Sequence, residues 1–320
     1  MNVLLAGGAW FIGSHFCDAL LARSDTVVAI DNFATGRRQN IEHLLDHPQF
    51  SLIEHDITLP LPGFDLSFDA VLDLASPASP DDFATMPLEI LAVGSVGTRN
   101  LLDLCVADGA RFFLASTSEV YGDPLVHPQP ESYLGNVSCI GPRSCYDEAK
   151  RFSEATTMAY HRVHDIEVRI VRIFNTYGER MRPRDGRVVN TFVVQALEQQ
   201  PITLHGDGSQ TRSFCHVADE LRGLTAVLDG SITGPVNVGN PGEFTMRELA
   251  ELVIEVTGSS SEIVSIPLPP EREGDPLQRK PDIALVQSTY GWSPTIALRD
   301  GLERMTEHFR QVEGIGSGRV

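Results

Sequence analysis

The sequence predicts a doubly wound α/β fold, in which helices cover both faces of a parallel sheet. Short apolar runs alternate with helical patterns through the first half of the chain, at 27–30, 70–72, 112–115 and 168–171. Such alternation is typical of parallel strands that are joined by helical crossovers. A glycine-rich turn, Gly7–Gly13, directly follows the first apolar run and points to the same class. Ligands of these sheets bind beyond the carboxyl ends of the strands, so we expect the functional residues there.

The glycine-rich turn nearly matches a dinucleotide-binding turn, but it has Trp10 where a glycine is expected. Such a turn opens a helix whose N-terminal amides and positive dipole end receive a diphosphate. A helix from about Ile12 would direct Phe16 and Leu20 toward the sheet. The middle glycine of the pattern lets backbone and phosphate approach closely. We therefore expect the indole of Trp10 to crowd the ligand unless the loop moves aside.

Acidic residues follow the next two predicted strands. Asp31 ends the second strand, about 20 residues beyond the turn, where a carboxylate accepts hydrogen bonds from an adenosine ribose. This position favours NAD over NADP, although Arg37 and Arg38 lie nearby. Asp56 after the third strand and residues 74–76 after the fourth stand where adenine and the cofactor riboses should lie. Ordinary capping of the strand ends would explain these residues equally well.

Tyr146 and Lys150 are four residues apart, so they share one face of a predicted helix. A phenol with a pKa near ~10 needs adjacent positive charge to act as a base at neutral pH, and Lys150 supplies an ammonium group. The alternative is a surface pair on an exposed helix. Upstream, the strand ending at Ala115 leads into Ser116–Glu119, whose hydroxyl groups and carboxylate can hold a sugar hydroxyl. A solvated turn is the alternative there.

Arginines are concentrated after the predicted sheet. Four of them occupy one loop, Arg180, Arg182, Arg184 and Arg187, and a fifth, Arg212, follows a later turn. Guanidinium groups pair bidentately with phosphate and carboxylate oxygens, so this pattern indicates a highly anionic ligand. We expect Arg180 and Arg184 to be solvated.

Charge and composition exclude several classes of protein. A net charge of −18 at pH 7 argues against a nucleic-acid partner. We find no uninterrupted apolar stretch of ~18 residues and no signal-peptide n-region, so we expect no membrane association and a cytoplasmic protein. The five cysteines form an odd set without zinc-site spacing, which fits a reducing compartment and no metal site.

We predict two lobes and a tail. A cofactor-binding lobe would comprise residues 1–174 plus about 215–240, and a smaller α/β lobe would comprise 175–214 plus about 241–312. Residues 313–320 read as a disordered tail. The helical patterns at 94–107 and 147–163 are candidates for a dimer face, although two core helices would look the same.

These motifs together resemble the extended short-chain dehydrogenase/reductases, and among them the UDP-glucuronic acid decarboxylases. The matching segments are Ala115–Gly122, Gly141–Tyr146, Arg172–Gly178 and Gln278–Asp282, and the likeness covers about 3–309. The resemblance implies a Rossmann sheet with a C-terminal substrate-binding lobe. It further implies NAD as cofactor, UDP-glucuronic acid as substrate and usually a homodimer.

The resemblance also implies roles for individual residues. The catalytic set is Thr117, Ser118, Glu119, Tyr146, Lys150 and Arg279. The cofactor set is Gly7, Trp10, Phe11, Ile12, Gly13, Asp31, Asn32, Asp56, Ile57, Leu74, Ala75, Ser76, Tyr146 and Lys150. The substrate set is Pro77, Ser79, Glu119, Asn175, Arg187, Arg212 and Arg279, in which Asn175, Arg187 and Arg212 contact UDP and Arg279 the sugar carboxylate.

In the implied reaction, Tyr146 removes the proton of the sugar 4-hydroxyl while a hydride leaves carbon 4 for NAD⁺. The resulting β-keto acid loses carbon dioxide, with Glu119 and Arg279 positioning the carboxyl group and assisting protonation at carbon 5. Return of the hydride gives UDP-xylose. Ser118 stands where sugar-nucleotide 4,6-dehydratases have an aspartate, so dehydration would lack its acid.

Trp10 departs from the family pattern, and we therefore expect weak retention of NAD and some release of UDP-4-keto-pentose. Two alternatives stay open at this point. One is a UDP-sugar 4-epimerase or another NAD-dependent sugar-nucleotide enzyme. The other is a non-enzymatic binder of NAD or nucleotide sugars on a degenerate scaffold.

Overall fold

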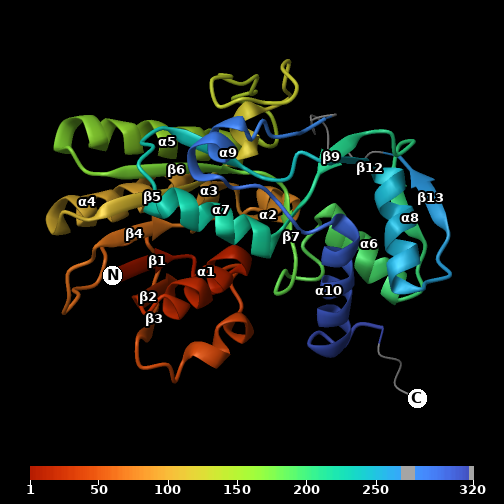
Figure 1. Ribbon diagram of the computed structural model, residues 1–320, viewed down its shortest axis with the longest axis horizontal. Coiled ribbons are helices and arrows are strands. Elements are labelled where there is room, and N and C mark those ends of the chain that lie inside the picture. The colour runs from red at the N-terminus through yellow and green to blue at the C-terminus, as the bar shows by residue number, and fades with distance from the viewer. Residues whose placement is uncertain (268–277, 317–320) are drawn as a thin grey trace.

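The computed structural model describes residues 1–267 and 278–316, and it contains a parallel sheet of seven strands (Figure 1). The strands lie in the order β11-β6-β5-β4-β1-β2-β3. Their bounds are β1 (Asn2–Ala6), β2 (Thr26–Asp31), β3 (Phe50–Glu54), β4 (Ala70–Asp73), β5 (Arg111–Thr117), β6 (Val168–Ile173) and β11 (Pro235–Val238). The predicted doubly wound sheet is confirmed, and the four apolar runs named above lie in β2, β4, β5 and β6.

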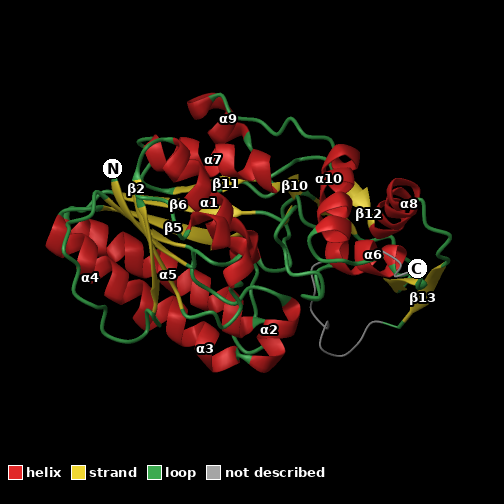
Figure 2. Ribbon diagram, turned by 90° about the horizontal axis from the view of Figure 1, so that it is seen from below, coloured by secondary structure: helices red, strands yellow, loops and turns green. Residues whose placement is uncertain are grey.

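The strands are continuously apolar because helices cover both faces of the sheet. In β1, residues Val3–Ala6 are fully buried, with Leu4 in register with Val28 on one side and Val71 on the other. Figure 2 shows the two helical layers, one on each side of the strands.

The first layer consists of α1 (Phe11–Ala22), α7 (Val217–Asp229) and α9 (Ala284–Tyr290). Phe16 and Leu20 of α1 are fully buried in the core that this layer forms with the sheet, as the helical spacing predicted. The second layer consists of α2 (Pro80–Thr85), α3 (Pro87–Ala92), a π-helical stretch (Val93–Gly97), α4 (Thr98–Asp108) and α5 (Ser144–His164). Leu101 and Leu102 of α4 are fully buried against the sheet.

A second lobe lies at the carboxyl ends of the strands and has a core of its own (Figure 1). Its helices are α6 (Val188–Leu197), α8 (Met246–Thr257) and α10 (Leu298–Gln311). Three two-stranded sheets connect them: β7 (Thr176–Tyr177) with β10 (Cys215–His216), β8 (Ile202–His205) with β13 (Ile263–Ile266), and β9 (Thr211–Ser213) with β12 (Glu243–Thr245). Leu249, Leu302 and Phe309 are fully buried at the centre of this lobe.

The chain end differs from the sequence expectation. Residues 313–316 of the predicted disordered tail make defined contacts, because Ile315 is buried in the second lobe and its amide donates to Phe309 O. Glu313 also forms an ion pair with Arg37, with Nη1 to Oε1 at 2.6 Å. Residues 317–320 of that tail, and most of the proline-rich stretch at 267–281, lie outside the described residues.

One helix among the described residues, Pro87–Asp108, has the length and mean composition of a membrane span, although Glu89, Arg99 and Asp103 interrupt its apolar residues. In its most apolar 18-residue window, 39% of the residues are buried inside the protein. Leu101, Leu102 and Cys105 of this helix belong to the core of the sheet, and core helices of soluble proteins pass the same test.

Candidate functional site

A cavity of about 750 Å³ lies at the carboxyl ends of the strands and is walled by both lobes. Most of the predicted site residues meet here: Trp10, Phe11, Ile12, Gly13, Leu74, Ser76, Thr117, Ser118, Glu119, Tyr146, Lys150, Asn175, Arg187, Arg212 and Arg279. The structure therefore brings the glycine turn, the hydroxyl cluster, the Tyr146 helix and the arginines into one site.

The remaining predicted residues do not line this cavity: Gly7, Asp31, Asn32, Asp56, Ile57, Ala75, Pro77 and Ser79. Asp31 and Asp56 lie at the ends of β2 and β3, further along the same edge of the sheet. Ser79 also has a structural role. It is fully buried and caps α2, since its hydroxyl accepts from the amide of Asp82.

The glycine turn needs all three of its glycines for its own packing, since a Cβ on Gly8 would lie 2.7 Å from Ala29 Cβ. Gly7 has φ +83°, and a Cβ there would lie 2.8 Å from Leu74 O. A Cβ on Gly13 would lie 2.0 Å from Gly7 O. Trp10, in contrast, has φ −86° and ψ 177°, an extended conformation open to any residue. The backbone therefore tolerates tryptophan at the position where the family pattern has glycine.

Trp10 is the N-cap residue of α1, and its side chain makes no capping hydrogen bond. The first amides of a helix have no intrahelical partners, so this helix end is suited to an anion such as a diphosphate. The half-buried indole packs against the core of the second lobe, and the guanidinium carbon of Arg182 lies 5.3 Å from its ring centroid. This is how the structure accommodates the unexpected side chain.

The buried Asp31 carboxylate lies next to the turn and accepts from two amides, Ala9 N and Phe33 N, both at 2.8 Å. Burial raises its pKa, and these two hydrogen bonds oppose the shift. A carboxylate keeps further lone pairs after two such bonds, so ribose hydroxyl donors fit this position. At Asp56, burial also acts to raise the pKa, but hydrogen bonds from Thr58 and Asn32 outweigh it and the pKa is lowered. These residues fit the adenosine half of NAD.

Tyr146 is buried at the start of α5, with its ring stacked on that of Phe83 at 4.8 Å between centroids. Burial raises its pKa to about 12, although a hydrogen bond with Thr117 and the charge of Arg187 act in the opposite direction. The sequence interpretation attributed a lowered pKa of Tyr146 to Lys150 and the positive nicotinamide ring together, and it stays a prediction. The phenolate requires further positive charge at the site.

Lys150 is buried one helical turn after Tyr146, and its Nζ donates to Ala115 O at 2.9 Å. Burial lowers the pKa of this ammonium group, while the carboxylates of Asp73 and Glu154 act to raise it. The carbonyl at the end of β5 thus holds the lysine in the cavity wall, where a bound cofactor would meet it.

Glu119 is held by two guanidinium groups. Nη1 and Nη2 of Arg279 donate to its two carboxylate oxygens at 2.6 and 2.7 Å, and Arg143 Nη2 lies 2.7 Å from Oε2. Burial alone would raise the pKa of Glu119, but the two arginines outweigh it and hold the pKa at about 2. Glu119 is therefore a carboxylate at neutral pH, and its part in positioning the sugar carboxyl group and assisting protonation at carbon 5 stays a prediction.

Arg143 is a site residue that the sequence analysis missed. It precedes α5, lines the cavity, and its guanidinium carbon lies 5.3 Å from the Phe83 ring centroid. Its only signal in the sequence is its place in the Gly141–Tyr146 motif, since nothing in the spacing relates it to Glu119.

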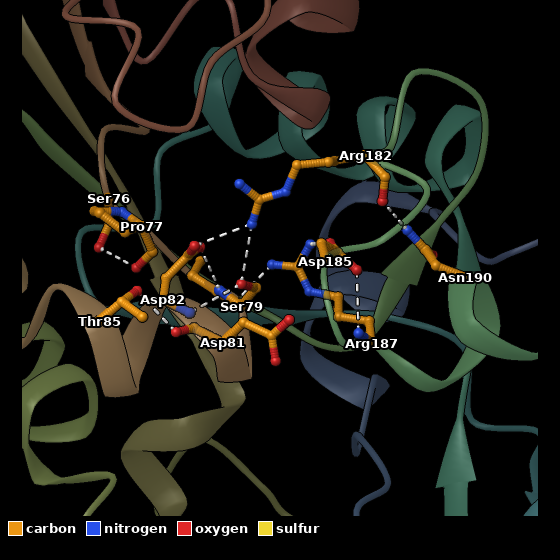
Figure 3. Close-up of polar contacts among 11 residues, drawn as sticks. Ser76, Pro77, Ser79, Asp81, Asp82, Thr85, Arg182, Asp185, Arg187 and Asn190 are labelled. Atoms are coloured by element: carbon orange, nitrogen blue, oxygen red, sulfur yellow. Dashed lines mark hydrogen bonds and ion pairs between the residues drawn. The ribbon is translucent and has the colours of Figure 1, made fainter. Parts of the chain in front are cut away.

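Arg187 and Arg212, which were predicted to bind UDP, have partners within the protein, and Figure 3 shows those of Arg187. Arg187 donates to Asp185 Oδ2 at 2.9 Å and to Ala78 O at 2.7 Å. Arg212 donates to Thr211 O at 2.8 Å. An incoming diphosphate must therefore share or replace some of these contacts.

The two arginines expected to be solvated differ from each other. The side chain of Arg184 is 66% exposed, as expected, and pairs with Glu198. Arg180 is mostly buried, because its Nη1 lies 2.7 Å from Asp18 Oδ2.

Among the described residues, no group of three or more His, Cys, Asp or Glu side chains is arranged to hold a metal ion.

Comparison with known protein families gives a match over residues 3–239 to the NAD dependent epimerase/dehydratase family. The chain belongs to this family. The resemblance stated from the motifs is thereby confirmed, and so is the use of NAD.

Two relatives within the family are close in sequence. UDP-glucuronic acid decarboxylase 2 of Arabidopsis thaliana is 51% identical over 311 residues, which are 97% of this chain and 68% of the relative. UDP-glucuronic acid decarboxylase 1 of Danio rerio is 46% identical over 313 residues, which are 98% of this chain and 73% of the relative.

A solved structure of a similar protein contains ligands. The UDP-glucuronic acid 4-epimerase of Bacillus cereus, in complex with UDP-glucuronic acid and NAD, has a TM-score of 0.86 and 30% identity, covering 98% of this chain and 100% of that one.

Proposed function

We propose that the protein decarboxylates UDP-glucuronic acid to UDP-xylose through a 4-keto intermediate, with NAD as an internal redox cofactor. One observation carries this proposal. Arg279 is 5% exposed and binds a carboxylate, that of Glu119, beside the Thr117–Tyr146 pair. The site thus combines a cation suited to the sugar carboxylate with a candidate base for the 4-hydroxyl. The decarboxylase relatives support the same reading.

The roles follow from the contacts. When bound, NAD⁺ supplies the hydride acceptor for carbon 4 and a positive ring that favours the Tyr146 phenolate. Tyr146 takes the proton of the 4-hydroxyl, and Thr117 holds the oxygen. Arg279 exchanges part of its pairing with Glu119 for the sugar carboxylate, while Arg143 keeps Glu119 ionised. The 4-ketone makes the sugar a β-keto acid, so carbon dioxide leaves as the electrons of the broken bond form an enolate. The protonated Tyr146 then stabilises this enolate. A proton from solvent adds to carbon 5, the hydride returns to carbon 4, and Tyr146 gives its proton back to the carbon-4 oxygen, which completes UDP-xylose.

Incubation of the protein with UDP-glucuronic acid, with and without added NAD⁺, tests the function directly. Loss of the mass of carbon dioxide from the sugar nucleotide is the expected result. An unchanged mass with an inverted 4-hydroxyl would support the epimerase alternative instead, and an unchanged substrate would support the non-enzymatic binder.

We further propose weak retention of NAD, which rests on Trp10 at the N-terminus of α1. The indole occupies the position where a glycine would let the diphosphate approach the backbone. If NADH leaves before the ketone is reduced, UDP-4-keto-pentose is released beside UDP-xylose. Trp10→Gly should tighten NAD binding, as measured by equilibrium dialysis. Wild-type protein purified with a full complement of NAD would contradict this proposal.

We also propose a homodimer, formed through the helices at 87–108 and 144–164. Leu88, Val96 and Phe152 on these neighbouring helices are 75%, 48% and 54% exposed, which is unusual for large apolar side chains on adjoining helices. Phe152→Glu should yield monomers in sedimentation experiments, whereas Leu134→Glu, in an exposed loop, should not.

A cytoplasmic location remains our proposal, and the five free cysteines support it.

A further inference from the structure

The loop that follows β7 joins the second lobe to the cofactor side of the sheet. β1 and β4 are neighbours at the point where the strand order reverses, and dinucleotides bind in the crevice between the loops that follow such strands. On one side of this crevice is the turn at 7–13, and on the other is the loop at 74–82. Residues 180–187 contact both sides, Trp10 on the first and Ala78 and Asp82 on the second, so they cross the crevice.

The crossing loop, residues 180–187, is held in place by hydrogen bonds from two asparagine side chains to its backbone carbonyl groups. Asn40 Nδ2 donates both to Ala9 O in the glycine turn, at 3.1 Å, and to Arg180 O in the crossing loop, at 3.3 Å. Asn190 Nδ2 donates to Arg182 O at 2.7 Å. Figure 3 shows the carbonyl group of Arg182 directed to Asn190 and its guanidinium group directed to the opposite side.

The side chain of Arg182 connects the two sides of the crevice. Its guanidinium lies over the Trp10 ring, 5.3 Å from the centroid, on the side of the glycine turn. Its Nη2 donates to Asp82 Oδ1 at 3.0 Å and to Ser79 Oγ at 3.3 Å on the other side. Asp82 is 5% exposed and is itself fixed by the capping box of α2 (Figure 3). Trp10, Arg182 and Asp82 therefore form a continuous bridge, which we call the strap.

The strap is a consequence of the unusual residue in the turn, so Trp10 has two separate effects. Its indole keeps the diphosphate away from the backbone, which weakens NAD binding at equilibrium, and it supplies the ring under Arg182 in the strap, which slows release. A glycine at position 10 would have no ring for the guanidinium, and a cation over an aromatic face is held by the negative charge of that face. Arg182 Nε is buried and has no hydrogen-bond partner among the described residues, so the group is not saturated by Asp82 and Ser79.

We propose that the strap of Trp10, Arg182 and Asp82 closes the cofactor crevice, and that its opening sets the rate at which NAD(H) leaves. Arg182 and Asp82 are then positioning residues that determine the product. Slow opening keeps NADH in place until the 4-ketone is reduced, and fast opening releases the ketone. The effect on product rests on the proposed decarboxylation, whereas the effect on cofactor release does not.

The test compares Arg182→Gln and Asp82→Asn with Arg184→Gln, a control in the same loop whose side chain is 66% exposed. Each protein is loaded with NADH and mixed with excess NAD⁺, and the loss of NADH fluorescence gives the release rate. Both strap variants should release NADH about threefold to tenfold faster, from the usual magnitudes of ion pairs and cation–π contacts. The control should match the wild type.

The Asp82→Asn variant distinguishes the strap from an alternative explanation, in which Arg182 only attracts the diphosphate of the cofactor. If Arg182 only attracted the diphosphate, freeing it from Asp82 would slow the release of NADH. Slower or unchanged release in Asp82→Asn would therefore overturn the proposal, and so would unchanged release in Arg182→Gln. Thermal unfolding of each variant shows whether the capping box of α2 is intact, and Arg182→Gln decides the question if Asp82→Asn does not fold.

The products give a second readout. In the strap variants, the ratio of UDP-4-keto-pentose to UDP-xylose should rise with the release rate. If the wild-type protein does not consume UDP-glucuronic acid, the proposed function fails, while the NADH release rates still decide whether the strap exists.

Discussion

Glu220 in α7 is a fully buried carboxyl group outside the candidate site, and its ionisation should make the stability of the protein depend on pH. Cys215 and Thr176 are its polar neighbours, but neither of its oxygens has a hydrogen-bond partner of normal geometry. Burial raises its pKa from 4.5 to about 8. The pKa of Glu220 is higher in the folded protein than in the unfolded chain. Its contribution to the free energy of unfolding is therefore fully present below pH 4.5 and is lost as the pH rises through 8.

The free-energy cost of burying ionised Glu220 follows from the size of its pKa shift. Each pKa unit corresponds to ~1.4 kcal/mol, so keeping Glu220 buried costs ~3 kcal/mol at pH 7 and approaches ~5 kcal/mol above the folded-state pKa. Glu220→Gln keeps the shape and cannot ionise. The free energy of unfolding of the variant, relative to wild type, should therefore rise by about 3 kcal/mol or more between pH 5 and pH 8.

Urea denaturation at several pH values measures this difference. Taking the difference between variant and wild type removes the contributions of other titrating groups, such as His15, whose pKa is lowered to about 4, chiefly by burial. Glu251→Gln on the exposed face of α8 is the matched control and should leave the pH profile unchanged. Parallel pH profiles for Glu220→Gln and wild type would refute the reasoning.

Three further predictions concern the site and the surface. Gly13→Ala places a Cβ 2.0 Å from Gly7 O, so NADH binding should be lost and the unfolding temperature lowered; normal binding in a fluorescence titration would contradict this. Arg143→Gln removes one of the two cations on Glu119, so the turnover rate should fall at least ~tenfold and the acidic limb of the pH–rate profile should move to higher pH. An unmoved acidic limb would count against this role. Of the five cysteines only Cys139 is exposed, so a thiol reagent should label one thiol in the native protein and five after unfolding.

The sequence was informative wherever a local pattern decides the structure. Strands buried on both faces must be apolar throughout, so β2, β4, β5 and β6 could be found as apolar runs. Tyr146 and Lys150 share a helix face by spacing alone. The glycine turn could be placed because a backbone that needs positive φ or close approach at Gly7 and Gly13 leaves a glycine pattern.

Contacts between segments distant in sequence left no such pattern. Arg143 and Arg279 converge on Glu119 from separate segments, and only the fold brings them together. The pairing of Arg182 with Asp82 spans 100 residues. Ile315 shows the same limit: a single apolar residue in a glycine-rich tail gives no signal, yet it is buried against the second lobe.

The central claim is that Tyr146, beside Arg279 and Glu119, takes the proton of the 4-hydroxyl of UDP-glucuronic acid while a hydride passes to NAD⁺, so that the oxidised sugar loses its carboxyl group. The most direct measurement is the release of labelled carbon dioxide from UDP-glucuronic acid labelled at carbon 6, in wild type and in Tyr146→Phe with NAD⁺ added. The account predicts release by the wild type and its loss in Tyr146→Phe, while the variant still binds NADH. Undiminished release from Tyr146→Phe, or no release from the wild type with NAD⁺ bound, would contradict it.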